Sequence, residues 1–163
     1  VVTREAVKEE ALIDRMLSEG HVVGFHSMDH QNAMVRGYLH TKKDFRTGCE
    51  FMKRKGISDI WYRPPWGLTN LFSWHFVRKY GMKMVLWDVM AEDWEREATV
   101  GSIRKKCLSR VKDGSILCLH DGGRRTGGAP GAPEKTLEAL AYVIPALKEA
   151  GYRFILPSES VSG

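Results

Sequence analysis

Two histidines four residues apart, His26 and His30, have the clearest chemical potential in this sequence. They follow a short apolar run, residues 22–25. Catalytic zinc sites take three protein ligands and leave the fourth coordination position to water. The pair therefore predicts two ligands of a zinc or other divalent metal site, with no third ligand evident nearby. A histidine pair that binds no metal is the alternative.

Three further candidates, Arg63, Asp93 and His120, also come shortly after apolar segments that we expect to be strands. In parallel α/β folds the carboxyl ends of the strands open on one face, and sites are built there. We therefore expect these side chains to gather with the histidine pair on one rim. The alternatives are a solvent-exposed turn for Arg63, a helix cap for Asp93 and a strand end bonded to the backbone for His120.

Two tryptophans, Trp66 and Trp94, lie close to these candidates in the sequence. On a rim they would offer flat apolar faces with polar edges, which suit a sugar ring. The alternative is that both are core aromatics. We predict them as substrate-binding residues.

The elements that must position these residues repeat one pattern of helix, glycine and strand. Short apolar strands that alternate with amphipathic helices predict a parallel sheet covered by helices, an α/β fold. Two irregular stretches, 26–41 and 121–133, are expected to be loops. The expected helices are 4–19, 42–55, 71–80, 100–111 and 134–150, and the expected strands are 22–25, 60–62, 82–87, 115–119 and 152–156.

Length and composition predict one globular domain, residues 1–163, with 43% hydrophobic and 28% charged residues. The formal net charge is +5, but the basic residues are scattered along the chain, which argues against a nucleic-acid partner. No apolar run approaches the roughly 20 residues that span a bilayer. Cys49, Cys107 and Cys118 stand among apolar neighbours and are expected to be buried free thiols.

Four motifs follow one another along the chain: His26-Ser27-x-x-His30, Arg63-Pro64-Pro65-Trp66-Gly67, Asp93-Trp94 and Leu117-Cys118-Leu119-His120-Asp121. Their order resembles that of polysaccharide deacetylases, a carbohydrate esterase family that includes chitin, peptidoglycan and acetylxylan deacetylases. The resemblance covers essentially the whole chain. It implies a distorted (β/α) barrel, an acetylated polysaccharide as substrate, and metal-dependent hydrolysis of N-acetyl or O-acetyl groups in the cell envelope or outside the cell.

The same resemblance implies a role for each candidate. His26 and His30 would hold the metal, usually zinc, which polarises the acetyl carbonyl and lowers the pKa of the attacking water. His120 would be the general acid that protonates the leaving group, and Asp93 would orient it. Arg63 would orient the aspartate that acts as base.

The two tryptophans also have implied roles. The backbone N–H of Trp66 would help to hold the oxyanion of the tetrahedral intermediate. Trp94 would form part of the wall around the acetyl methyl group.

The sequence departs from the family pattern at several positions. Met90 stands where relatives commonly have an aspartate, and Cys118 where they commonly have leucine. The family's first motif, Thr-Phe-Asp-Asp-Gly, does not occur, and its two aspartates supply the base and the third metal ligand. Asp29 lies between the histidines, but its spacing makes it an awkward substitute.

The missing motif leaves two interpretations. We expect the chain to be an N-terminally incomplete piece of a deacetylase whose opening strand precedes Val1. The alternative is a catalytically silent relative that binds glycan on its tryptophans, or a fragment that is inactive by itself.

Overall fold

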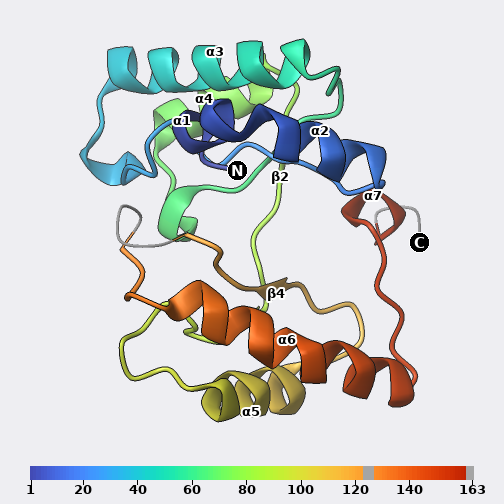
Figure 1. The fold of residues 1–163 in the computed structure, drawn as a ribbon. Helices are drawn as coiled ribbons and strands as arrows, with labels where there is room; N and C mark the ends of the chain where they lie inside the picture. The colour runs from blue at the N-terminus through green and yellow to red at the C-terminus, as the bar shows by residue number, and fades with distance from the viewer. Residues whose placement is uncertain (123–126, 161–163) are drawn as a thin grey trace. The chain divides into compact units, whose positions relative to one another are not determined.

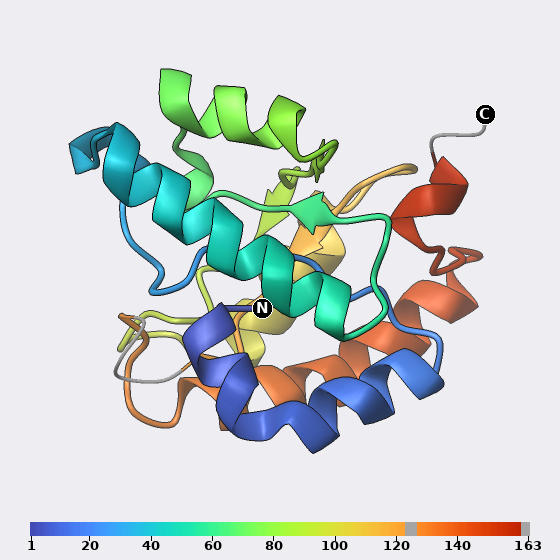
Figure 2. The ribbon, with the colours of Figure 1, turned by 90° about the horizontal axis from the view of Figure 1, so that it is seen from above.

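A computed structural model describes residues 1–122 and 127–160 of the chain. The predicted loop 121–133 therefore lies partly outside the described residues. The chain folds as two compact units, Val1–Leu86 and Trp87–Gly163, and each is described by itself. Both combine α-helices with short parallel strands, as Figures 1 and 2 show, which confirms the predicted α/β class.

The first unit contains three parallel backbone segments. Strand β1 pairs with β2, with Trp61 opposite Lys83, and Phe25 forms a single parallel bridge to Tyr62. The predicted strand at 22–25 is thus reduced to one bridging residue. The elements of this unit are α1 (Thr3–Ala6), η1 (Val7–Glu9), α2 (Glu10–Ser18), η2 (Ala33–Val35), α3 (Tyr38–Arg54), β1 (Trp61–Tyr62), η3 (Pro65–Gly67), α4 (Leu71–Lys79) and β2 (Lys83–Met84).

The core of the first unit is an aromatic cluster between these segments and the helices α3 and α4. The Phe45 ring lies 5.4 Å from Phe25, 4.8 Å from Tyr62 and 5.9 Å from Phe76, measured between ring centroids. All four side chains are buried. Gly48 of α3 faces this cluster, because a Cβ atom there would lie 2.2 Å from a Phe25 ring carbon.

The second unit pairs two short strands in parallel and covers them with two long helices. Val89 lies opposite Leu117 and Met90 opposite Cys118. Helices α5 and α6 pack side by side (Figure 1), with Ile103 and Val143 in their shared core. The elements are β3 (Val89–Met90), α5 (Val100–Arg110), β4 (Leu117–Cys118), α6 (Ala132–Glu149) and α7 (Pro157–Ser160).

Further expectations about local structure also need correction. The predicted strand 152–156 does not form, since it pairs with no described segment, and Phe154 and Ile155 are exposed. The predicted helix 4–19 is broken into α1, η1 and α2. The three cysteines are buried and free, as expected. Among the described residues, no helix combines the length and apolarity that crossing a bilayer requires.

Gly48→Ala should destabilise the protein by about 1–3 kcal/mol, because the added methyl group forces the locked Phe25 ring to move. Gly101→Ala, a glycine of α5 whose added Cβ would meet only the Thr99 hydroxyl at 3.9 Å, is the matched control. It should be neutral or stabilise by up to about 1 kcal/mol, because alanine favours helix. Urea unfolding measures both variants. Equal stability of the two would contradict the packing assigned to Phe25.

Candidate catalytic and metal-binding residues

The parallel bridge at Phe25 places His26 beside Arg63. Phe25 N–H donates to Trp61 O at 2.7 Å, and Arg63 N–H donates to Phe25 O at 2.9 Å. The two chain segments therefore leave the bridge at the same point. There the His26 ring Nδ1 lies 2.6 Å from the Arg63 carbonyl oxygen.

This contact prepares His26 to bind a metal. A carbonyl oxygen only accepts hydrogen bonds, so Nδ1 carries the proton and Nε2 keeps a free lone pair. Burial lowers the pKa of His26 to about 4, although the contact with Arg63 O opposes this shift. At neutral pH the ring is therefore neutral. A backbone carbonyl that fixes the tautomer of a ligating histidine is a common second partner in metal sites.

His30 stands next to His26 on a strained loop. The two ring centroids are 4.9 Å apart, and the His30 ring lies 4.5 Å from the Trp66 ring. Ser27, His30 and Trp66 all have positive φ, between 51° and 59°, which is uncommon for residues other than glycine. Such strain gathers at functional sites.

The described residues supply two metal donors rather than three. Within residues 1–122 and 127–160, no three His, Cys, Asp or Glu side chains are grouped so that they could hold a metal ion. The Asp29 carboxylate is instead bound by Arg4, whose Nη2 lies 2.8 Å from Oδ2. This hydrogen bond lowers the pKa of Asp29. The histidine pair fits a divalent metal as part of a ligand set, and the predicted metal site stays a prediction.

Arg63 and Trp66 lie with the histidines in the first unit. The Arg63 guanidinium donates to Leu86 O at 3.2 Å, and its predicted role in orienting a base stays a prediction. The Trp66 side chain is 54% exposed and packs against His30, so a flat face is available beside the pair. The structure thus brings His26, His30, Arg63 and Trp66 together.

Asp44 is a neighbour of this loop that sequence reasoning missed. It lies in α3, and its Oδ1 accepts a hydrogen bond from Met28 N–H at 2.6 Å. Burial raises the pKa of Asp44 to about 6. Its only sequence signal is an acidic residue one position before the buried Phe45.

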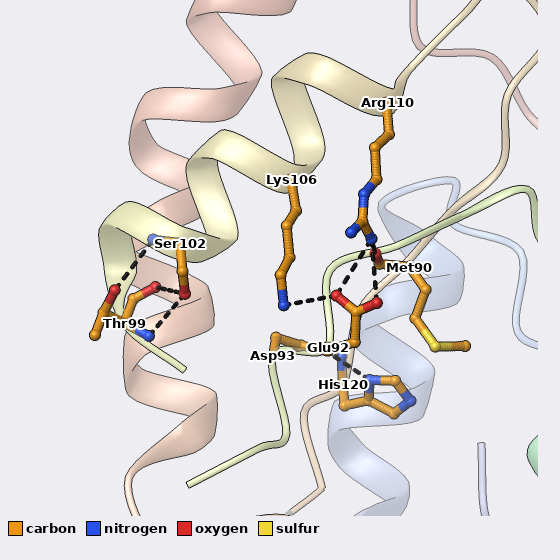
Figure 3. Close-up of polar contacts among 8 residues, drawn as sticks. All are labelled: Met90, Glu92, Asp93, Thr99, Ser102, Lys106, Arg110 and His120. Carbon is orange, nitrogen blue, oxygen red and sulfur yellow. Dashed lines mark hydrogen bonds and ion pairs between the residues drawn. The ribbon is translucent and has the colours of Figure 1, made fainter. Parts of the chain in front are cut away.

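In the second unit Asp93 and His120 form a hydrogen-bonded pair. Strands β3 and β4 pair in parallel, which brings together the segments that follow them and carry Asp93 and His120. His120 Nδ1 lies 2.8 Å from Asp93 Oδ1, and His120 N–H donates to Asp93 Oδ2 at 2.7 Å. Figure 3 marks the contact between the two residues with a dashed line. Asp93 is fully buried, while the His120 side chain is 36% exposed.

The Asp93 carboxylate is held in its ionised form. Burial by itself would raise its pKa, but the hydrogen bonds from the His120 ring, the His120 N–H and the Thr136 hydroxyl together lower it. Thr136, in α6, donates to Asp93 Oδ2 at 2.8 Å. Sequence reasoning missed this residue. Its signal is a threonine on the otherwise apolar face of α6, where Ala132, Ala139 and Val143 are also buried.

The turn that leads to Asp93 is clamped from α5. Glu92 has a φ of 49°, and its carboxylate accepts from Lys106 Nζ at 2.7 Å and from Arg110 Nη1 at 3.1 Å. The same Arg110 nitrogen donates to Met90 O at 2.7 Å (Figure 3). The Met90 backbone and the Glu92 side chain are therefore both tied to one helix. The Trp94 ring stands edge-on to His120, with centroids 4.7 Å apart.

Several known proteins have sequences similar to this chain. The sequence profile of the polysaccharide deacetylase family matches residues 1–85. A peptidoglycan-N-acetylglucosamine deacetylase of Bacillus cereus is 32% identical over 150 residues, which cover 91% of this chain and 67% of the relative. The PgdA deacetylase of Listeria monocytogenes is 27% identical over 98% of this chain, which spans 31% of that protein. A chitooligosaccharide deacetylase of Azorhizobium caulinodans is 29% identical, over 89% of this chain and 72% of the relative.

Solved structures show the same fold. The peptidoglycan N-acetylglucosamine deacetylase Bc1960 has a TM-score of 0.85 and 24% identity, over 98% of this chain and 72% of its own. A family 4 acetyl xylan esterase of Clostridium thermocellum has a TM-score of 0.83 and 25% identity, over 99% of this chain and 75% of its own. A family 4 pseudoenzyme of Bacillus anthracis has a TM-score of 0.81 and 20% identity, over 96% of this chain and 52% of its own. The predicted (β/α)-barrel class is thereby confirmed.

Two pKa shifts of opposite direction should make the stability of the metal-free protein depend on pH. His26 has a pKa lowered from 6.5 to about 4, so its contribution is present above pH 6.5 and is lost as pH falls towards 4. Asp44 has a pKa raised from 3.8 to about 6, so its contribution is present below pH 3.8 and is lost as pH rises through 6. Each shift corresponds to at most about 3 kcal/mol.

Asp44→Asn should therefore steepen the rise of stability between pH 4 and 6.5, because only the His26 contribution remains. His26→Gln should do the reverse, so that its stability falls over the same range. Urea unfolding at several pH values, with a chelator present, measures both. Parallel curves for the variants and the unsubstituted protein would contradict the assigned pKa values.

Thr136→Val should cost about 1–2 kcal/mol of unfolding free energy, since a buried charged acceptor loses one of its donors. Thr136→Ser keeps the hydroxyl and should retain most of the stability. Urea unfolding of the two variants tests the difference. If valine proves as stabilising as serine, the Thr136–Asp93 hydrogen bond does not contribute as the geometry indicates.

Proposed function

Because the chain belongs to the polysaccharide deacetylase family, we propose that it forms part of a metal-dependent hydrolase that removes acetyl groups from a polysaccharide. The curated relatives named above act on peptidoglycan N-acetylglucosamine and on chitooligosaccharide. Both substrates are built on N-acetylglucosamine, so we propose an N-acetylated glycan of this class. A place in the cell envelope or outside the cell follows from that substrate. An O-acetylated glycan is the alternative substrate.

The observation that carries the proposal is the Asp93–His120 pair. Hydrolysis of an acetamide needs a proton for the departing amine, and a histidine that is partly exposed and held by an ionised carboxylate can deliver it. Asp93 fixes the ring through Nδ1, so Nε2 is directed away from the carboxylate and can carry the proton to the leaving group.

His26 and His30 would hold the divalent metal, for which zinc is the preferred candidate. A bound metal of this kind polarises a carbonyl and lowers the pKa of a bound water. The contribution of the chain is to keep His26 neutral and to fix its tautomer through Arg63 O, so that Nε2 is available. Other donors must complete the ligand set.

Trp66 and Trp94 would bind the sugar. Trp66 offers an exposed ring beside His30, and Trp94 packs against His120. Aromatic faces suit the apolar side of a pyranose ring. Each tryptophan therefore stands next to one of the proposed reactive residues, and its substitution should raise KM more than it lowers kcat.

A second candidate is a relative that binds glycan without hydrolysing it. The sequence has no Thr-Phe-Asp-Asp-Gly motif, and the described residues hold no third metal donor near the histidines. A pseudoenzyme of the same fold exists. The tryptophan faces would serve such a protein equally well.

An assay of the complete gene product on N-acetylglucosamine oligomers, with and without chelator, separates the two candidates. A deacetylase should release acetate, lose activity with chelator and regain it with Zn²⁺. His120→Ala should lower kcat by about 10²–10⁴-fold, the usual contribution of general acid–base catalysis. His21→Ala, an exposed histidine, should leave activity unchanged.

Binding of the oligomers without acetate release would instead identify the glycan-binding relative. The parent gene gives an independent check. An Asp-Asp-Gly motif encoded upstream of Val1 supports the enzyme, and a parent gene without this motif opposes it.

A further inference from the structure

The loop that joins the two histidines is strained at both ends. Ser27 has a φ of 59° and His30 a φ of 51°, and neither is glycine. A residue other than glycine in the left-handed region costs roughly 1–2 kcal/mol and persists where its surroundings hold it there. The contacts made by this loop therefore decide whether the two imidazoles can bind one metal.

Three hydrogen bonds fasten the backbone of the loop. Thr3 N–H donates to Ser27 O at 3.0 Å, and Arg4 N–H donates to Met28 O at 3.1 Å. The third bond runs in the other direction, from Met28 N–H to Asp44 Oδ1 at 2.6 Å. Asp44 thus accepts from the middle of the loop, halfway between the histidines, and it does so from the long helix α3.

A small pocket lies beside Asp44. Its volume is about 20 Å³, and Ser27, Gln31, Thr41, Asp44 and Tyr62 are among the residues that line it. One water molecule needs about 10–15 Å³ and two to four polar partners. The volume therefore suits a single water molecule, and the lining is polar enough to bind it.

Two side-chain atoms at this pocket lack a protein partner. Ser27 is 4% exposed, and its Oγ and the Gln31 Oε1 are buried without a hydrogen bond to any described residue. A buried polar atom without a partner costs about 1–3 kcal/mol. The phenol of Tyr62 is also close enough that the charge of Asp44 adds to the rise in its pKa, which burial mainly causes.

We infer that Asp44 is a positioning residue for the histidine pair, and that one water molecule in this pocket completes its hold on the loop. The water accepts from the Ser27 hydroxyl and donates to the Asp44 carboxylate and to Gln31 Oε1. Asp44 then holds the Met28 N–H directly and the Ser27 side chain through the water. The inference rests on the proposed metal role of the pair, and it adds the group that keeps both rings in place.

Zn²⁺ titration of the chain, followed by the ring NMR signals of His26 and His30, tests the inference. Asp44→Ala should weaken Zn²⁺ binding about 10–100-fold, as is usual when a partner outside the ligand shell is lost. Asp44→Asn should restore binding, because its amide oxygen still accepts from Met28 N–H. Glu50→Ala, on the exposed face of α3, is the matched control and should bind as the unsubstituted chain does. Equal affinities for Asp44→Ala and Asp44→Asn would overturn the inference.

Hydrogen exchange keeps the test decisive if Asp44→Ala fails to fold. In the unsubstituted chain the Met28 amide should exchange at least about tenfold more slowly than an open loop amide, since the partly buried Asp44 carboxylate accepts its proton. Exchange at the open-loop rate would overturn the role of Asp44. A long-lived water with a nuclear Overhauser effect to Ser27 supports the second part, and its absence overturns that part.

Failure of the proposed function would be distinguishable from failure of this inference. If the unsubstituted chain shows no Zn²⁺ response at either histidine, the metal role fails. The ring-to-ring Overhauser effect between His26 and His30, expected at a centroid distance of 4.9 Å, then decides the positioning role. Loss of this signal in Asp44→Ala with recovery in Asp44→Asn supports the inference, and its persistence in Asp44→Ala overturns it.

Discussion

Parallel pairing of very short backbone segments is the constraint on which both groups of candidate residues depend. In the first unit a single bridge between Phe25 and Tyr62 brings His26 to the carbonyl of Arg63. In the second unit, β3 pairs with β4 through two residue pairs. This pairing brings together the segments that follow the two strands, so that Asp93 and His120 come into contact. The pairing is parallel, so the residues that follow both segments leave on the same side. A shift in register would separate each pair of functional side chains.

Such short pairings carry little stability by themselves, and buried side chains supply the rest. The Phe25 ring is locked between Phe45 and Tyr62, with Gly48 leaving room for it. In the second unit the ionised Asp93 is fully buried, a costly state that persists because His120 and Thr136 donate to it. The hydrogen bonds that stabilise the carboxylate are thus the same ones that orient the imidazole.

Most of the candidate residues follow a short strand or bridging segment, and this placement is the signal by which the sequence singles them out. Their catalytic and binding roles stay predictions. The Asp93–His120 contact and the proximity of His26, His30 and Trp66 are local consequences of that placement. The convergence of all these residues on one rim stays a prediction. The residues that hold the candidates in place, Asp44, Glu92 and Thr136, could not be predicted in the same way. Each makes its contact with an element that is distant in the sequence, and such a contact leaves no periodic pattern in the sequence. Segment 152–156 has the composition of a strand, yet strand formation requires a partner that composition does not reveal.

The fold alone does not decide between catalysis and glycan binding, because a pseudoenzyme shares it. The structural features that cost stability are more informative. A platform for sugar requires exposed aromatic rings, but it does not require left-handed backbone at Ser27 and His30 or a neutral, partly buried His26. Nor does it require an ionised carboxylate buried behind a partly exposed imidazole. Each of these features lowers stability unless other contacts compensate, and each is suited to metal binding or proton transfer. Their presence together favours the hydrolase over the passive binder.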